Sequence, residues 1–416
     1  MSSDSFTSSP ENVWRDRYLA IQGLFYFAQG VAMGALLFFP AFLDTLLISP
    51  FERIVIQAVI WLPWYLKIAF GLLSDNLPIG RFGRRKPYVF MAGVLGIIGW
   101  VTLPMHQAFG PLVVVSGILA SFGTSMSDAT IDALAVDITP ARRRGAMQGA
   151  SWGSRGIGFG ISAIAVGLLA EGGQWVIIYS VPGVVVSFSC FLILLFKENP
   201  LPPDFKRVSM SVYSSVFRQK NVLICLLFQL FAGAGIAILA LMQTLLQEGL
   251  GFDQITIGIV FAFFSVGMFL GAVVFGVLGD KLSVRVTLPS LTVAYAIVIL
   301  AILIMDTANT TMVTAFFCIV GVVNGGYEAT QMRISMDNSP VVVSGTVYNL
   351  YNSVSNVGQL AIGAIAIAAL VEVIGDYRIG WQLAIVFLVI ALVVGLRLLR
   401  TQESVDTPEP GLPLAP

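Results

Sequence analysis

The stretch GLLSDNLPIGRFGRRKP, from Gly71 to Pro87, lies between two long apolar segments of the chain. It opens with small and aliphatic residues that lead to Asp75, and four of its last seven residues are basic. Charge of this density is excluded from bilayer hydrocarbon, whereas apolar runs of about 20 residues are long enough to cross it as helices. The stretch therefore indicates a short charged loop that joins two transmembrane helices.

The composition of the whole chain agrees with a protein that folds in lipid. Of its 416 residues, 57% are hydrophobic and only 11% are charged, whereas about 25% are charged in ordinary soluble domains. Acidic and basic residues are equal in number, 23 of each, so net charge does not favour nucleic acid as a partner. We expect an integral, multi-pass protein of the cell (inner) membrane whose surroundings are the lipid bilayer.

Residues that would hold a metal or perform catalysis are scattered. The single histidine, His106, has no partner at ligand spacing, and the three cysteines lie unpaired inside apolar runs. No phosphate-binding loop and no nucleophile–base set appears at catalytic spacing. The sequence therefore predicts no metal, no cofactor and no enzymatic activity.

Apolar runs of transmembrane length recur along the chain, and their number predicts an all-α membrane protein of twelve helices. Their approximate bounds are Tyr18–Phe42, Ile54–Ser74, Pro87–Met105, Pro111–Val136, Ala146–Ala170, Trp175–Phe196, Val222–Leu246, Ile255–Leu278, Val286–Met305, Met312–Met336, Thr346–Val371 and Trp381–Leu399.

The distribution of basic residues predicts the orientation in the membrane. The two terminal segments and the loops on their side hold 18 of the 23 Lys and Arg, and the opposite side holds only Arg53 and Arg378. Because cytoplasmic loops collect positive charge, both termini are expected to be cytoplasmic.

A polar stretch from Lys197 to Lys220 divides the twelve helices into six and six. The predicted organisation is a cytoplasmic N-terminal segment (1–17), an N-terminal six-helix bundle (18–196), a cytoplasmic linker (197–221), a C-terminal six-helix bundle (222–400) and a disordered cytoplasmic tail (401–416). The halves also match in sequence, since a shift of 200 residues places Asp128-Ala-Thr on Glu328-Ala-Thr and Asp137 on Asp337. Such matches favour two pseudo-symmetric bundles that arose by duplication.

The Gly71–Pro87 loop resembles the signature of the major facilitator superfamily, G-x-L-x-D followed by a G-R-R-[RK]-P cluster. The resemblance implies the two-bundle fold of that superfamily and transport by alternating access, as in a symporter. It also implies that charges at the cytoplasmic ends act as a gate that latches the bundles together. The gating residues expected from it are Asp75, Arg81, Arg84 and Arg85, with Asp280 in the degenerate second copy; the alternative is that the basic residues only set the topology.

Three further stretches narrow the resemblance to the folate–biopterin transporter family, with weaker likeness to muropeptide permeases and acetyl-CoA transporters. They are PWYLK (Pro63–Lys67), SDATIDAL (Ser127–Leu134) and QGASWGSR (Gln148–Arg155). The likeness implies a small organic substrate, anionic and similar to a pterin or folate.

Basic side chains inside apolar runs are costly, so they normally face water or a charged partner. At 1.5 Å per helical residue, Lys67 lies about 12 Å inward from Asp75, and Arg155 about 15 Å inward from Gly145. We expect both to bind an anionic group of the substrate near mid-membrane.

Polar side chains recur at helical spacing on several predicted helices, and such stripes indicate an aqueous cavity shared by the two bundles. Gln29, Asn324 and Asn352 belong to the stripes of the first, tenth and eleventh helices. These three residues are therefore also predicted to contact the substrate.

Acidic side chains at the same depth are the predicted proton carriers, because a carboxyl group that alternates between water and protein can load and release a proton. They are Asp128, Asp132 and Glu328. The competing interpretation is a static ion pair, such as Asp128–Arg155 or Arg333–Asp337, and the sequence leaves both possibilities open.

Taken together, these patterns predict a secondary active transporter, monomeric and coupled to H⁺, that moves a small organic anion. The alternative is a transporter-like membrane scaffold or assembly factor that carries nothing. Such a scaffold would not need charged residues at mid-membrane in both halves.

Overall fold

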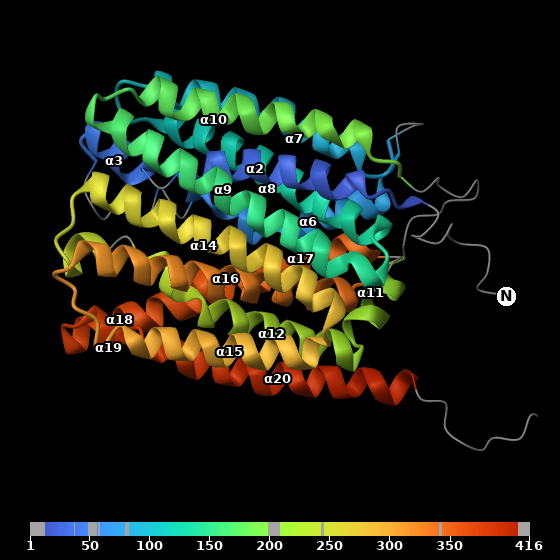
Figure 1. Ribbon diagram of the computed structural model, residues 1–416. Coiled ribbons are helices and arrows are strands. Elements are labelled where there is room, and N and C mark those ends of the chain that lie inside the picture. The colour runs from blue at the N-terminus through green and yellow to red at the C-terminus, as the bar shows by residue number, and fades with distance from the viewer. Residues whose placement is uncertain are drawn as a thin grey trace, which may run out of the picture.

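The computed structural model describes residues 13–406, with gaps at 37, 49–55, 57–58, 80–82, 199–208, 243–244 and 341–342. All regular elements of these residues are helices, and the long ones run side by side in one layered bundle (Figure 1). In a helix the backbone N–H and C=O groups bond to one another, so they need no partner from the lipid, which offers none. The prediction of an all-α membrane fold is confirmed.

The N-terminal half consists of one set of long helices with short helical pieces at their ends. Its α-helices are α2 (Arg17–Leu36), α3 (Phe39–Thr45), α5 (Leu62–Tyr65), α6 (Lys67–Asn76), α7 (Lys86–Thr102), α8 (Pro111–Ile138), α9 (Arg144–Glu171) and α10 (Trp175–Ser189). Three short 3₁₀ segments accompany them, η3 (Leu103–Met105), η4 (Ala141–Arg143) and η5 (Cys190–Leu195).

The C-terminal half follows after the short helix α11 (Met210–Phe217), which lies within the predicted linker. Its α-helices are α12 (Lys220–Gly235), α14 (Gln254–Lys281), α15 (Val284–Ala301), α16 (Thr310–Asp337), α17 (Ser344–Asn356), α18 (Ala364–Ile374), α19 (Tyr377–Gly380) and α20 (Leu383–Asp406). The segments η6 (Ala237–Leu241), η7 (Leu245–Gly249) and η9 (Val357–Gly363) interrupt them. Because α20 continues to Asp406, the last helix ends later than the predicted boundary at residue 400.

Eleven stretches of the described residues are long and apolar enough to cross a membrane. Each corresponds to one of the twelve predicted helices. The remaining one, Ile54–Ser74, begins in residues outside the described part and continues as the short helices α5 and α6. The count of twelve therefore stays a prediction.

Two of the predicted helices change their winding along their length. α12 gives way to the 3₁₀ segment η6 and the π-helical η7, and α17 gives way to the π-helical η9 before α18. The π-helical η9 packs on the end of α12 and on η6, since a Cβ atom on Gly358 would collide with the backbone of Leu230, and one on Gly363 with Ala237. Small residues allow this close backbone approach, which a uniform α-helical pattern does not reveal.

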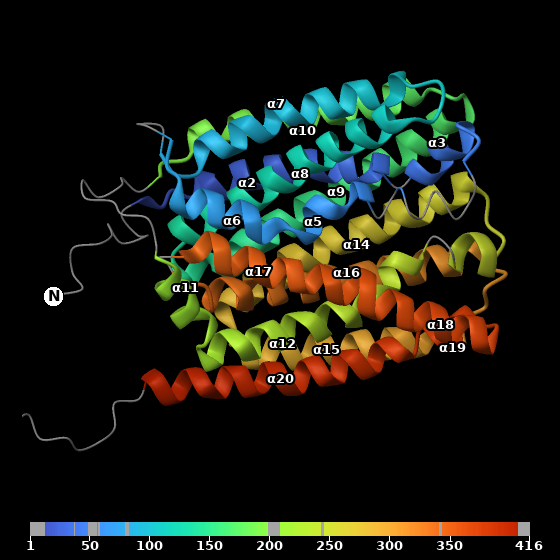
Figure 2. The ribbon, with the colours of Figure 1, turned by 180° about the vertical axis from the view of Figure 1, so that it is seen from behind.

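The two halves meet along α9 and α14, which lie side by side in both views (Figures 1 and 2). Gly145 and Gly149 of α9 pack against the backbone of Gly276 and Ala272 on α14. A second contact between the halves joins α6 to α17, where Gly71 packs against Gly345. Glycine at these positions lets the helices approach closely.

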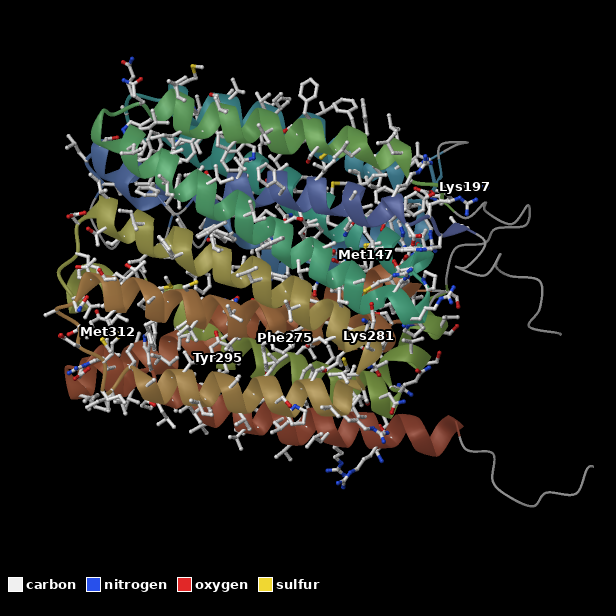
Figure 3. The ribbon with its side chains drawn as sticks, in the orientation of Figure 1. Met147, Lys197, Phe275, Lys281, Tyr295 and Met312 are labelled. Atoms are coloured by element: carbon white, nitrogen blue, oxygen red, sulfur yellow. The ribbon has the colours of Figure 1, made fainter. Side chains whose placement is uncertain are left out.

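The start of α2 and the end of α20 lie at the same end of the bundle (Figure 1). Lys197 and Lys281 lie at this end too, and Met312 lies at the opposite end (Figure 3). We call the former the basic end. Outward-facing side chains between the two ends are apolar, and Leu168, Ile297 and Val393 each expose about 60% of their surface, as suits contact with lipid.

Candidate functional site: a buried charge cluster and a latch at the basic end

Four polar side chains of the N-terminal half meet in what we call the central cluster: Gln29, Lys67, Asp128 and Arg155. Asp128 on α8 is at its centre, with 1% of its side chain exposed. One of its oxygens forms an ion pair with Lys67 of α6. The other accepts hydrogen bonds from Arg155 of α9 at 2.8 Å and from Gln29 of α2 at 2.7 Å. One carboxylate therefore holds two buried cations, and the cluster carries a net positive charge.

A break in the helix before Lys67 positions this lysine. α5 ends at Tyr65, Leu66 lies between the two helices with a non-helical backbone, and Lys67 then begins α6. Pro63 lies in the first turn of α5, where proline is well tolerated. The break places the Lys67 ammonium against Asp128 and 4.9 Å from the ring of Trp64.

Aromatic rings hold the Arg155 guanidinium from two sides. Its central carbon lies 4.3 Å from the ring of Trp152, one turn earlier on α9, and 4.6 Å from the ring of Tyr26 on α2. A further hydrogen bond joins Arg155 to the side-chain oxygen of Gln29. Guanidinium groups stack well on aromatic faces, and these two rings help to bury the charge.

Asp132, one turn after Asp128 on α8, connects the cluster to the C-terminal half. It accepts a hydrogen bond from the hydroxyl of Tyr26, the same residue that stacks on Arg155. Its other oxygen accepts from the amide of Asn352 on α17 at 3.2 Å. Asp132 therefore bridges the two halves of the molecule near the centre.

The C-terminal half contributes Asn324 and Glu328 from α16. Asn324 is fully buried and its side-chain oxygen accepts a hydrogen bond from Tyr295 at 3.0 Å. Glu328 is 5% exposed, and its helix packs against α9, which carries Arg155. No hydrogen bond or ion pair from the described residues reaches its carboxylate.

The structure brings together most of the residues that the sequence predicted for the centre. Lys67, Arg155, Gln29 and Asp128 are in direct contact, and Asn352 reaches Asp132. The expected open aqueous cavity is wrong for this arrangement, because the cluster is packed closed and Arg155, its most exposed charge, exposes only 12% of its side chain. The charges are compensated by pairing with one another inside the protein.

The competing ion-pair interpretation is borne out as geometry for both pairs. Arg155 contacts Asp128, and Arg333 lies 3.6 Å from Asp337 one turn later on α16. The contact of Lys67 with Asp128 had no signal in the sequence, since the two residues are 61 positions apart on different helices.

A second charged network lies at the basic end, and we call it the basic-end latch: Asp75, Arg84, Arg85, Asp137, Ser344 and Thr346. Arg85 is 1% exposed and pairs with Asp75 at 2.7 Å and with Asp137 at 3.0 Å. Burial alone would lower the pKa of Arg85, but the two carboxylates outweigh it and raise the pKa above its ordinary value. The charge of Arg85 is therefore secured inside the latch.

The latch connects the two halves through the start of α17. Asp75 of α6 accepts hydrogen bonds from the backbone N–H and the hydroxyl of Thr346, both at 2.7 Å. Ser344 donates to Asp137 of α8 and accepts from Arg85 at 3.2 Å. Backbone N–H groups in the first turn of a helix lack intrahelical partners, so a carboxylate is well placed there.

The gating residue predicted in the second half, Asp280, forms the matching contact between the end of α14 and the start of α9. Its two oxygens accept from the backbone N–H groups of Gly145 and Ala146 at the start of α9, each at 2.8 Å. Arg333 approaches the same carboxylate at 3.5 Å. Of the other predicted gating residues, Arg84 pairs with Asp137 at 2.6 Å, and Arg81 lies outside the described residues.

Two residues of the latch region were missed by sequence reasoning. Asp137 appeared only as part of the internal repeat, although it holds both Arg84 and Arg85. Glu198 lies just after η5, and its carboxylate accepts from the backbone N–H groups of Arg84, Arg85 and Lys86 at 2.8, 3.0 and 2.7 Å. Nothing in the sequence indicates that Glu198 lies beside the Arg–Arg–Lys run in space, because 112 residues separate Glu198 from Lys86.

A bundle of long apolar helices in two related halves, with charges buried at its centre and a charged network at one end, defines a polytopic membrane protein with a charged cluster inside its span. The family model of the Major Facilitator Superfamily matches residues 18–361 and 225–415. The chain belongs to this superfamily.

Curated relatives and solved structures agree with this assignment. The chain is 30% identical over 220 residues to the folate-biopterin transporter of Synechocystis, which covers 50% of the chain and 43% of that relative. It is 29% identical over 121 residues to a probable folate-biopterin transporter 4 of Arabidopsis thaliana, covering 28% of the chain and 24% of that relative. The matched region thus spans less than half of these relatives, and it supports a resemblance to the folate–biopterin transporter family.

Two solved structures have the same fold at low sequence identity. The transporter FucP in its outward conformation aligns with a TM-score of 0.69 at 13% identity, covering 92% of this chain and 98% of that one. The human organic anion transporter MFSD10 (TETRAN) aligns with a TM-score of 0.70 at 12% identity, covering 93% and 99%. These likenesses concern the fold alone.

Proposed function

We propose that the chain is a secondary active transporter, a symporter that carries a small organic anion of the pterin or folate kind together with H⁺. The observation that carries the proposal is the central cluster, in which the single carboxylate of Asp128 holds both Lys67 and Arg155 inside the membrane span. Buried charges are retained at such cost mainly where they serve transport. The resemblance to proteins named folate-biopterin transporters supports the substrate class.

The coupling step follows from competition for the two cations. When Asp128 is ionised, its oxygens are paired with Lys67 and Arg155, and an incoming anion would have to displace these oxygens from the two cations. A proton on Asp128 removes its negative charge and frees both cations for the anionic group of the substrate. Release of the proton on the other side restores the ion pairs and expels the anion, so neither moves productively without the other.

Asp132 is proposed as a second protonatable group that links the cluster to movement of the halves. It holds Tyr26, which stacks on Arg155, and Asn352 of α17 in the C-terminal half. Protonation of Asp132 would weaken both hydrogen bonds, because a neutral carboxyl is a poorer acceptor than a carboxylate. Loss of these contacts would favour separation of α8 from α17.

The latch supplies the alternation of access that the mechanism requires. We propose that the basic end is cytoplasmic, in the cell membrane, and that Asp75, Arg84, Arg85 and Asp280 close this end when the site takes up substrate from the other side. The contacts of Asp75 with Thr346, and of Asp137 and Arg85 with Ser344, join the N-terminal half to α17, so these must break for the halves to part there. We propose a monomer, since both halves of the site belong to one chain.

Uptake into proteoliposomes that contain the purified full-length chain tests the proposal. We expect saturable uptake of radiolabelled folate or 6-carboxypterin that is driven by an inward proton gradient and collapses with a protonophore. Lys67→Gln and Arg155→Gln should each weaken apparent affinity about 10- to 100-fold, the worth of a charge-assisted hydrogen bond. Asp376→Asn, which removes a carboxylate from the loop before α19, is the matched control and should change neither the apparent affinity nor the proton-driven uptake.

Two outcomes would overturn the proposal. An absence of saturable, gradient-dependent flux for any organic anion would favour the alternative of a scaffold or assembly factor. Proton-driven accumulation that survives Asp128→Asn would remove Asp128 from the coupling mechanism.

A further inference from the structure

The carboxylate of Glu328 stands apart from the other buried carboxylates of the molecule. Asp75, Asp128, Asp132 and Asp137 each have at least two partners. Glu328 is equally deep and has no hydrogen bond or ion pair among the described residues. An unpaired buried carboxylate costs several kcal/mol, so its position is one where a ligand would be expected to supply the partner.

Asn324 adds a donor on the same face of α16. Asn324 and Glu328 are four residues apart, so their side chains lie one above the other on the helix. The hydroxyl of Tyr295 donates to the side-chain oxygen of Asn324, and this bond turns the amide so that its NH₂ group points elsewhere. That NH₂ group is buried and has no acceptor among the described residues.

Together the two residues present the two carboxylate oxygens of Glu328, which are acceptors, and the side-chain NH₂ group of Asn324, which is a donor. Tyr295, which orients Asn324, lies between the basic end and the opposite end of the bundle (Figure 3), so this surface is deep inside the span. α16, which carries Glu328, packs against α9, which carries Arg155 of the central cluster. A ligand bound between them would meet cations on one side and this acceptor–acceptor–donor edge on the other.

We propose that Glu328 and Asn324 recognise the 2-amino-4-oxopyrimidine edge of the substrate, while Lys67 and Arg155 hold its anionic group. That edge presents two adjacent N–H donors, which fit a carboxylate as a bidentate pair, followed by a carbonyl oxygen, which fits the amide NH₂. The inference rests on the proposed function, since it names what the same site binds. It assigns Glu328 to substrate recognition and leaves the transported proton to Asp128.

Two ligands that differ only at this edge test the proposal on the full-length protein. 6-Carboxypterin carries the 2-amino group, and lumazine-6-carboxylate carries a carbonyl oxygen in its place, which would face the carboxylate with an acceptor. Titration by ligand fluorescence should show that the wild type prefers 6-carboxypterin by about 100-fold, because a buried polar group rejects an analogue that leaves it unpaired. Glu328→Gln should abolish that preference and retain binding of lumazine-6-carboxylate.

Further variants separate recognition from general damage. Asn324→Ala should weaken both ligands alike, since both keep the 4-oxo group, and Asp376→Asn should leave the preference intact. If Glu328→Gln does not fold, Glu328→Asp serves instead, and the shorter carboxylate should reduce the preference at least several-fold.

The results also distinguish this inference from the proposed function. Equal affinity of the wild type for the two ligands, with proton-driven uptake of 6-carboxypterin intact, would overturn the recognition role alone. An unchanged preference in Glu328→Gln together with lost proton-driven accumulation would instead make Glu328 a proton carrier. Failure of the wild type to bind or transport either compound would overturn both proposals.

Discussion

At the scale of single residues, Asp128 pairs with two cations, whereas Glu328 has no hydrogen bond or ion pair among the described residues. Asp128 neutralises only one of the two cations that it holds, Lys67 and Arg155. Glu328 lies on α16 of the other half, which packs against the helix that carries Arg155, and no hydrogen bond or ion pair among the described residues joins the two side chains. The arrangement leaves a positive charge that can be shared among Asp128, Glu328 and a ligand, which is the property that a coupled anion site needs.

The first prediction concerns the stability of the central cluster. Asp128→Asn leaves Lys67 and Arg155 close together without their shared anion, and removal of one partner of a buried ion pair costs about 3–5 kcal/mol. The thermal unfolding midpoint of the purified protein should therefore fall by several degrees. Addition of Lys67→Met to this variant should recover part of the loss, because only Arg155, still stacked on two rings, then lacks an anion.

An unchanged unfolding midpoint in Asp128→Asn would show that water or lipid headgroups already screen the two cations. Lys67→Met alone provides the reference for the double variant, since it should destabilise less than Asp128→Asn. Additive effects of the two substitutions would contradict a shared ion pair.

The depth of these residues was predictable, but their pairing was not. Counting residues from the loops placed Lys67, Arg155, Asp128 and Glu328 near mid-membrane, because helical rise is constant. Which cation meets which carboxylate depends on how four helices pack, and no spacing along one helix encodes that. That Glu328 has no partner in the part of the chain that the structure describes is likewise a property of the packing and has no counterpart in the sequence.

At the scale of elements, Glu198 acts as a cap for α7 that comes from a distant part of the chain. Helix α7 begins at Lys86, and its leading N–H groups have no intrahelical acceptor. Glu198 accepts from three consecutive groups, and the loop passes so close to it that a side chain on Gly83 would collide with the carboxylate. Gly83 also has a φ of 99°, which favours glycine. The cap thereby orients Arg84 and Arg85 toward Asp137.

The second prediction follows from this cap. Glu198→Gln replaces a charged acceptor by an amide whose NH₂ group repels the N–H donors, so the start of α7 should open more often. Hydrogen exchange of the Arg84, Arg85 and Lys86 amides should accelerate by about 10- to 100-fold, the equivalent of a charge-assisted hydrogen bond. Lys197→Gln, one residue away, should leave the exchange of these amides unchanged, and equal acceleration in both variants would argue against a specific cap.

The helices themselves were predicted well because their signal is local. Hydropathy over about 20 residues located eleven spans that the structure contains. The departures occur where tertiary contacts replace regular winding: the break before Lys67, the η6 and η7 segments after Gly235, and the π-helical η9. Apolar composition is the same in an α-helix and in these irregular turns, so hydropathy does not distinguish them.

At the scale of the whole molecule, the centre and the basic end are linked by shared helices. α8 carries Asp128 and Asp132 in the centre and Asp137 at the basic end, while α17 carries Asn352 in the centre and Thr346 at the basic end. The two elements are held together at both levels, by Asp132 with Asn352 and by Asp137 with Ser344. A change in protonation or ligation at the centre can therefore bias the latch through rigid helices.

The third prediction concerns the balance between closed and open arrangements of the basic end. Asp75→Asn removes the ion pair with Arg85 and weakens two hydrogen bonds from Thr346, so the closed arrangement should lose about 3 kcal/mol, a shift of about 100-fold in population. Substrate binding, which depends on the central cluster, should remain within a few-fold of wild type, while turnover should slow because closure becomes unfavourable.

Distances between spin labels at Arg142 and Arg400, in a background without the native cysteines, measure this balance directly, since both positions are exposed and belong to different halves. The closed arrangement should give one narrow distance distribution, and Asp75→Asn should add a longer one. Thr346→Val, which removes the hydroxyl donor and keeps the backbone N–H, should produce a smaller fraction of the same long distance. If Asp75→Asn slowed turnover without adding the long distance, the latch would act on a step other than closure of the basic end. The link through α8 and α17 would then couple the two sites without opening the basic end.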